Sequence, residues 1–344
     1  MVCIRSKVFK NSLNNFMNQK RKMNSIEAME SEINRQILEI PKIKRLARIE
    51  SVHNCIFVGS GDSYVVGLIC SYLTNFNARC IDPADMLINP SISSGKTVFI
   101  ISISGKTQEN ILVARKIKKY SNKLIAVTNN LTSQLAKNCD DVVYLDYKNI
   151  GVTTAGTLSF VISMLTCANI VGKYVKVDNL SSIYEKSKRK AKVLVSKTEN
   201  LLRSPGRGSI IFLGNSILFP ISIYGSLKIN EVFGWKSFAY SLENFCHAPL
   251  FEITEDDLVL VFSSPKHSIN DKVKKLIRLL KKRKLNAIVV EIPDHNDIKI
   301  LLFSTMLIQS YVVRLAKTLK NQECYFLENT ELLNLSSQLI YNTK

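Results

Sequence analysis

The chain of 344 residues is 46% hydrophobic and 22% charged, which is typical of a folded protein and excludes a largely disordered one. No apolar run reaches the ~20 residues that a membrane helix needs, and neither zinc-finger spacing nor an aromatic RNA-binding motif is present. Because the net charge of +19 is concentrated in a leader, a connector and one helix face, we expect no nucleic-acid or membrane partner.

The cysteines and the N-terminus indicate a cytoplasmic protein. None of the eight cysteines forms a Cys-x-x-Cys pair, and the four histidines have no metal-ligand spacing. Residues 1–22 are basic and lack the apolar stretch of a signal peptide. We therefore expect reduced thiols, no metal, no cofactor and a disordered leader over residues 1–22.

Short apolar strands alternate with helices from residue 23 onward. We expect a first domain over residues 23–172, which opens with a helix from Ser25 to Leu38 capped by Ser25. The other elements expected in this domain are strands at 56–58, 97–102 and 124–128 and helices at 64–73, 108–120 and 160–171.

The second half of the chain repeats the first. A charged helical connector at 173–207 leads into a second domain at 208–320, and a tail follows at 321–344. Continuous apolar strands that alternate with helices are typical of parallel sheets covered on both faces. The predicted fold class is therefore α/β, with two tandem doubly wound parallel-sheet domains. The expected elements of the second domain are strands at 211–213, 258–262 and 287–291 and helices at 220–229, 271–284 and 298–319.

One loop of the first domain has the composition of a phosphate site. Ser102, Ser104 and Thr107 place three hydroxyls around Gly105, between a buried strand and the start of a helix. Backbone N–H groups at a helix start favour a phosphate dianion, and glycine lets the backbone approach it closely. In the second half Pro265 stands where an N–H would be needed, so we predict one phosphate site per chain.

The alternative is an ordinary βα turn in which Thr107 caps the helix. The Walker sequence Gly-x4-Gly-Lys-Ser/Thr is absent, so a P-loop ATPase is not indicated. A dinucleotide fingerprint is not supported either, because Tyr64 takes the last glycine position of a Gly-x-Gly-x-x-Gly pattern that starts at Gly59.

Four segments together carry a resemblance to a known family. Residues 61–64 are similar to a Gly-Thr-Ser-Tyr turn, and residues 102–107 to a Ser-Gln-Ser-Gly-Glu-Thr loop. Residues 224–231 resemble a Glu-Gly-Ala-Leu-Lys-Leu-Lys-Glu helix, and residues 243–249 resemble a Gly-Glu-Leu-Lys-His-Gly-Pro segment. From about Met29 to Ser337, the chain thus resembles the sugar isomerase (SIS) domain family, in particular the isomerase half of glucosamine-6-phosphate synthase.

The resemblance implies roles for individual residues. Glu231 would be the base that moves a proton between C1 and C2 through an enediol, and His247 would assist ring opening in a neighbouring subunit's site, within a homodimer. Lys228 would lie near the substrate. Phosphate binding is implied for Ser63, Ser102, Ser104, Gly105 and Thr107, and substrate binding for Gly61, Lys228 and Thr154.

The sequence departs from the family pattern at two segments. The synthases end in Asn-Leu-Ala-Lys, whose lysine forms a Schiff base, whereas residues 334–337 are Asn-Leu-Ser-Ser. Residues 149–156 lose the glutamate and the lysine of a Glu-Ile-Gly-Val-Ala-Ser-Thr-Lys segment but keep a hydroxyl at Thr154. No counterpart of the glutaminase domain is found in the sequence, so we do not expect glutamine-dependent amination.

These expectations favour an enzyme that binds a phosphorylated sugar. It would be an aldose–ketose isomerase, or an amino-sugar phosphate deaminase/isomerase, acting on a hexose 6-phosphate through an enediol. The alternative is a non-catalytic sugar-phosphate sensor or regulatory protein, which would bind the same ligand without turnover.

Overall fold

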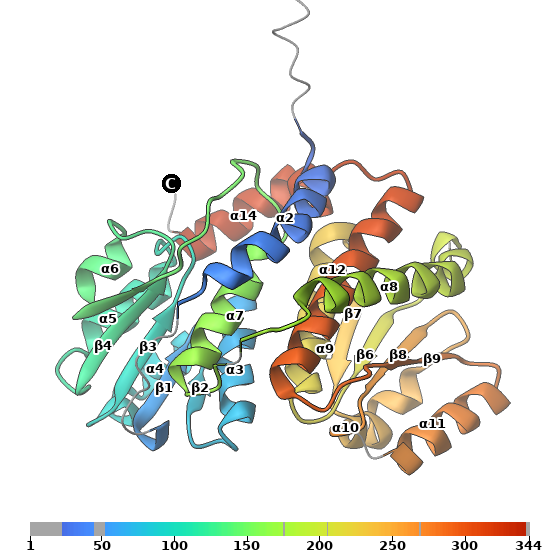
Figure 1. The fold of residues 1–344 in the computed structure, drawn as a ribbon, viewed down its shortest axis with the longest axis horizontal. Helices are drawn as coiled ribbons and strands as arrows, with labels where there is room; N and C mark the ends of the chain where they lie inside the picture. Colours follow the sequence, from blue (N-terminus) through green and yellow to red (C-terminus); the bar gives the residue numbers. More distant parts are fainter. Residues whose placement is uncertain (1–22, 45–51, 175, 205, 268–269, 342–344) are drawn as a thin grey trace, which may run out of the picture.

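Two parallel sheets organise the molecule (Figure 1). The computed structural model describes residues 23–44, 52–174, 176–204, 206–267 and 270–341, and the expected leader over residues 1–22 lies outside them. The first sheet has the strand order β2-β1-β3-β4-β5 and the second the order β7-β6-β8-β9. The prediction of an α/β fold with two tandem doubly wound parallel sheets is confirmed.

The first sheet is buried on both faces because its central strands are continuous apolar runs. Alternate residues point to opposite faces, so Phe57 and Phe99 stack on one face with ring centroids 5.1 Å apart, while Ile56 and Val98 lie in a separate cluster on the other. Its strands are β1 (Cys55–Val58), β2 (Arg79–Ile81), β3 (Thr97–Ile101), β4 (Lys123–Thr128) and β5 (Asp141–Tyr144).

Helices cover both faces of this sheet. One face packs against α2 (Ser25–Glu39), α3 (Asp62–Leu73) and α7 (Leu158–Ile170). The other face packs against α4 (Pro83–Ile88), α5 (Gln108–Ile117) and α6 (Gln134–Asn138). The single-turn 3-10 helices of the described chain are η1 (Ile40–Lys42), η2 (Val52–Asn54), η3 (Pro90–Ser93) and η4 (Pro249–Glu252).

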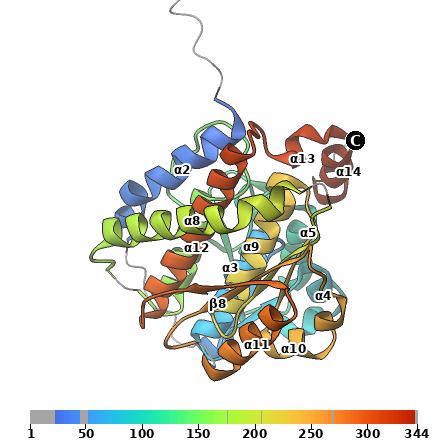
Figure 2. The same ribbon diagram turned by 90° about the vertical axis from the view of Figure 1, so that its right-hand side faces the viewer.

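The second sheet repeats this arrangement with four strands, β6 (Ile210–Leu213), β7 (Ser237–Tyr240), β8 (Leu258–Ser263) and β9 (Asn286–Glu291). One face packs against α8 (Leu180–Arg203), α9 (Leu218–Phe233) and α12 (Asp297–Thr318), and the other against α10 (Leu242–His247) and α11 (Asn270–Lys282). Figure 2 shows α8 lying across α12. Two short helices, α13 (Tyr325–Glu328) and α14 (Thr330–Tyr341), follow in the region expected as a tail.

The helices between the two sheets form one continuous core. Phe160 of α7 stacks on Tyr224 of α9 with ring centroids 3.9 Å apart. Buried Gln309 of α12 donates to the Tyr224 hydroxyl at 2.9 Å and accepts from Gln36 of α2 at 2.7 Å. Since buried polar groups that satisfy one another fix a unique packing, this network sets how α9 lies against the first sheet.

Two sequence expectations need correction. The cap of α2 is Asn24, not Ser25: the Asn24 side chain accepts from Glu27 N at 2.8 Å, and Glu27 reaches back to Asn24 N. The Ser25 hydroxyl instead accepts from Cys324 N at 2.7 Å, which ties α2 to the segment before α13. Also, α12 is long and apolar enough to cross a membrane, but 89% of its most apolar window is buried in the described core.

Candidate functional site

The predicted phosphate loop follows β3 and ends at α5. The Ser102 and Thr107 hydroxyls lie 3.2 Å apart, and Ser104 Oγ accepts from Lys106 N at 3.3 Å. Thr107 occupies the cap position of α5, but its side chain caps no backbone N–H, in contrast to the ordinary turn considered as the alternative. The first N–H groups of α5 have no partner within the helix, so they and these hydroxyls are available to an anion.

Only glycine fits at position 105. Gly105 has a φ of +63°, and a Cβ built there would lie 2.2 Å from Ser133 Oγ. Its N–H donates to Ser102 O at 3.1 Å, and its carbonyl accepts from Leu135 N at 3.2 Å. The loop is therefore held from behind by the start of α6, and its shape is fixed before any ligand arrives.

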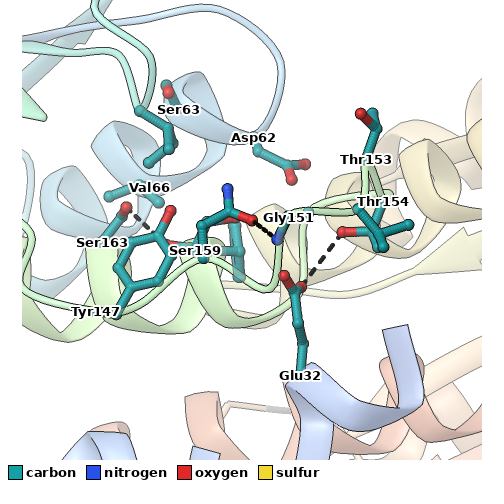
Figure 3. Close-up of a pocket in the computed structure, with 15 residues that line it drawn as sticks. Glu32, Asp62, Ser63, Val66, Tyr147, Gly151, Thr153, Thr154, Ser159 and Ser163 are labelled. Atoms are coloured by element: carbon teal, nitrogen blue, oxygen red, sulfur yellow. Dashed lines mark hydrogen bonds between the residues drawn. The ribbon is translucent and has the colours of Figure 1, made fainter. Parts of the chain in front are cut away.

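A cavity of about 470 Å³ opens beside this loop (Figure 3). It lies at the switch point of the sheet, because β1 and β3 are neighbours while the chain between them visits β2 at the edge. Asp62 and Ser63 enter it from the start of α3, which follows β1, and Ile103 of the phosphate loop lines it from the turn after β3. Its volume is in the range of small-molecule sites, about 300–1,000 Å³.

The wall opposite α3 is formed by the segment 149–156 and the start of α7. Gly151 N donates to Asn149 Oδ1 at 2.8 Å, and Thr154 Oγ1 donates to Glu32 Oε2 at 3.3 Å. Thr157 also donates to Glu32, which comes from α2 and is almost completely buried. Burial raises the pKa of Glu32, while the hydrogen bonds from Thr157, the Leu158 N–H and Thr154 oppose that rise.

Lys228 and Glu231 lie on α9, beyond the Asp62 side of the cavity. Lys228 is completely buried, and its Nζ lies 2.9 Å from Asp62 Oδ2 and 2.5 Å from Glu231 Oε2. Burial lowers the pKa of Lys228, but Asp62 and Glu231 outweigh it and the net pKa is raised, so the ammonium is charged. Burial raises the pKa of Glu231 against the lowering effect of Lys228.

His247 is the predicted site residue that lies apart from the others. It ends α10 at the carboxyl end of the second sheet, its side chain is 77% exposed, and it pairs with Glu243 at 3.5 Å. It does not line the 470 Å³ cavity of its own chain. Gly61, also predicted, stands at the start of α3 with a φ of +56° and open space around its Cβ position.

The loop after β8, which corresponds to the phosphate loop in the second sheet, is bound to a carboxylate of the protein. Lys266 Nζ and His267 Nε2 each lie 2.7 Å from Asp297 Oδ1 at the start of α12. The Asp297 carboxylate therefore already pairs with Lys266 of this loop.

Comparison with protein-family models decides what the first sheet and its cavity are. Residues 48–170, which include β1, the phosphate loop and most of the cavity wall, match the model described as "SIS domain". This stretch of the chain is a SIS domain. The predicted resemblance is thereby confirmed for the half that holds the cavity, and residues 61–63 and 102–107 fall within the matched region.

Curated relatives extend the similarity into the second half. The glutamine–fructose-6-phosphate aminotransferase of Clostridium tetani is 24% identical over 236 residues, which cover 63% of this chain and 38% of that protein. The corresponding enzyme of Sulfurisphaera tokodaii is 26% identical over 216 residues, which cover 60% of this chain and 36% of that protein. The chain thus spans well under half the length of these relatives.

Solved structures share the fold over most of the chain. The glucosamine-6-phosphate deaminase of Thermotoga maritima superposes with a TM-score of 0.68 at 24% identity and covers 86% of this chain and 96% of that one. The tagatose-6-phosphate ketose/aldose isomerase of Escherichia coli gives a TM-score of 0.60 at 18% identity, covering 86% and 88%. These likenesses show that a sheet like that of the SIS domain is followed by a second one in the same arrangement.

Sequence analysis missed two carboxylates of the SIS domain cavity. Asp62 stands where the similar turn has threonine, so a pattern match passes over it. Glu32 lies on α2 next to the buried Met29 and Ile33, and an acid on the apolar face of a helix was the available signal. Of the predicted residues, Ser63 and Thr154 line the cavity, the loop 102–107 borders it through Ile103, and Lys228 reaches it through Asp62.

Proposed function

We propose that the chain is a phosphosugar isomerase or amino-sugar phosphate deaminase/isomerase that acts on a hexose 6-phosphate. The observation that carries the proposal is the connection of three features at one cavity: the phosphate loop through Ile103, the α3 turn through Ser63, and Glu231 through Asp62 and Lys228. The phosphate would be held by Ser102, Ser104 and Thr107 together with the first N–H groups of α5, with Ser63 as a further hydroxyl donor.

The proposed chemistry is a proton transfer. In an aldose–ketose isomerisation a base removes the proton from the carbon next to the carbonyl, an enediol forms, and the proton returns to the neighbouring carbon. Glu231 is the proposed base: it is partly buried, which favours a basic carboxylate, and the Lys228 ammonium beside it stabilises negative charge in the enediol. With an amino sugar, water then releases ammonia from the resulting imine.

We further propose that His247 assists ring opening in the cavity of a second copy. Its side chain is 77% exposed at the end of α10 and lines no part of its own chain's cavity, so a role in the site needs a neighbour. The active unit would be a homodimer in the cytoplasm, a reducing compartment in which the seven described cysteines would form no disulfide.

The test is turnover of defined phosphosugars by the purified chain. Glucosamine 6-phosphate should release ammonia if the chain is a deaminase, whereas interconversion of a hexose phosphate pair without ammonia indicates a plain isomerase. The Glu231→Gln variant should lose about 10²- to 10⁴-fold in kcat and keep phosphosugar binding, measured as a ligand-induced rise in Tm. Binding without turnover in the wild type would instead identify a sugar-phosphate sensor.

The role of His247 has its own complementation test. The variants His247→Ala and Glu231→Gln are each expected to be inactive, but a mixed dimer holds one site with Glu231 of one copy and His247 of the other. Co-expression of the two variants should therefore restore activity. If the mixture stays inactive while each variant still forms dimers, His247 does not serve a neighbour's site.

A further inference from the structure

An unusual charge arrangement of the described structure is the trio of Asp62, Lys228 and Glu231, in which a buried ammonium meets two partly exposed carboxylates. The Lys228 side chain is 0% exposed, and its ammonium bridges Asp62 Oδ2 at 2.9 Å and Glu231 Oε2 at 2.5 Å. Two carboxylates around one ammonium leave the trio with a net negative charge. A buried ion pair of this kind is expensive to desolvate, so it is weak evidence of a stabilising role and invites a functional explanation.

Asp62 joins this trio from the other sheet. It is the first residue of α3, directly before Ser63, and it lines the cavity of the SIS domain, whereas Lys228 and Glu231 belong to α9. Its Oδ2 is engaged by Lys228, while its Oδ1 is buried and has no hydrogen-bond partner within the described residues. The Asp62 carboxylate is therefore the direct ionic link between the cavity and α9.

The position of the Asp62 carboxylate depends on Gly156. A Cβ built at Gly156 would lie 2.3 Å from Asp62 Oδ2, so any side chain at position 156 would displace the carboxylate. The backbone at Gly156 cannot easily retreat, because its carbonyl accepts from the buried Tyr224 hydroxyl at 2.7 Å. In the similar family segments threonine stands at position 62 and lysine at 156, so this chain departs at both members of one contact.

We infer that Asp62 is a positioning residue that holds Lys228 against Glu231 from the wall of the cavity, in space that only a glycine at position 156 leaves free. The inference rests on the proposed function, in which Glu231 is the base. Asp62 Oδ2 occupies the space that a side chain at position 156 would need, and it gives Lys228 a second anchor so that its ammonium cannot swing away from Glu231 during the reaction.

The charges around Glu231 predict how Asp62 affects its protonation. The titratable groups that face Glu231 are Lys228 and Tyr224 on its own helix, Asp62 on α3, and Cys324 before α13. Burial raises the pKa of Glu231, Lys228 lowers it, and the negative charge of Asp62 raises it. Neutralising Asp62 should therefore lower the pKa of Glu231 and make it a weaker base.

The experiment compares Asp62→Asn with Asp141→Asn, a matched control in which the aspartate pairs with Lys123 at 3.1 Å outside the cavity. The readout is the titration of the Glu231 carboxyl by carbon NMR, with its signal assigned by its loss in Glu231→Gln. Asp62→Asn should lower the Glu231 midpoint and reduce kcat at least about 10-fold with KM nearly unchanged, and the control should do neither. An unchanged midpoint and kcat in folded Asp62→Asn protein would overturn the inference.

A second variant covers the case in which Asp62→Asn does not fold. Gly156→Ala keeps every charge but pushes the Asp62 carboxylate from its place, and it should also reduce kcat. In an Asp62→Thr background the carboxylate that collides with position 156 is absent, so Gly156→Ala should reduce kcat much less. Equal losses of kcat in both backgrounds would contradict the inference. A wild-type chain that is inactive on every phosphosugar would contradict the proposed function and not this inference. The two failures can be told apart because the titration of Glu231 tests the effect of Asp62 without any substrate.

Discussion

Ser102 Oγ lies 3.2 Å from Thr107 Oγ1 across the loop that joins β3 to α5. Ser102 is buried, and the Thr107 side chain caps no backbone N–H of the helix that it precedes. Hydroxyls that bond chiefly to each other can rotate to donate to a phosphate without breaking any contact that the fold needs. This pair is suited to the proposed phosphate site, and it leads to the first prediction.

Replacing both hydroxyls should weaken phosphate binding and leave the fold intact. The Ser102→Ala/Thr107→Ala variant loses two donors but no helix cap, so we expect at least about a 10-fold weaker phosphosugar affinity with little change in Tm. Isothermal titration with glucosamine 6-phosphate measures the loss. The control is Ser121→Ala, which removes a hydroxyl bonded to Ile117 O at the far end of α5. Equal affinities for the double variant and the wild type would contradict the assignment of the loop.

Position 105 should tolerate no side chain. Gly105→Ala introduces a Cβ at 2.2 Å from Ser133 Oγ in addition to a positive φ of +63°. Gly95→Ala is a matched control, since Gly95 has a φ of +67° but open space around its Cβ position. The control should cost about 1–2 kcal/mol of unfolding free energy from backbone strain alone. Gly105→Ala should lower the unfolding free energy, measured in urea, clearly more than Gly95→Ala does. Equal losses would show that the contact with Ser133 does not constrain the loop.

Glu32 predicts a pH dependence of stability. Its pKa is raised from 4.5, mainly by burial, so the folded state binds a proton that the unfolded state has already released. Folded chains then bind more protons than unfolded ones just above pH 4.5, and the contribution of Glu32 to stability falls as the pH rises through that window. Subtracting the unfolding free energy of Glu32→Gln from that of the wild type should give a difference that declines from pH 4.5 upward.

The control for this measurement is Glu30→Gln, a change at an exposed glutamate of the same helix that pairs with Lys317. It reports what the loss of one carboxylate does at the surface of α2. A wild-type minus Glu32→Gln difference that instead grows with pH above 4.5 would mean that the hydrogen bonds from Thr157 and Thr154 outweigh burial at this carboxylate.

The central strands and long helices could be predicted because their sequences are continuous apolar runs or strongly periodic. The predicted strands at 97–102 and 258–262 are observed at Thr97–Ile101 and Leu258–Ser263, and the helix at 298–319 is observed at Asp297–Thr318. The strands that sequence analysis missed, β2, β5 and β7, lie at sheet edges and are partly exposed. Each is only three or four residues long and begins with a polar residue, so the apolar signal there is short.

The loop at 102–107 could be proposed as a phosphate site from the sequence because all its candidate donors lie within six residues, whereas the rest of the site depends on contacts between distant segments. Thr154 meets Glu32 across 122 residues, and Lys228 meets Asp62 across 166. No local pattern encodes such pairs. Asp62 replaces threonine in a turn that otherwise matches the family pattern, and Gly156 stands where the similar segment has lysine. Neither departure could be explained before the structure placed Gly156 against the Asp62 carboxylate.

The most direct test of the account is deuterium exchange into a bound phosphosugar. In D₂O, a base that moves a proton between C1 and C2 exchanges it with solvent, so proton NMR should show deuterium entering that position of fructose 6-phosphate with the wild type and not with Glu231→Gln. Exchange that depends on Glu231 is the result that the account predicts. A wild-type chain that binds the phosphosugar, as shown by a raised Tm, but exchanges no proton would contradict it.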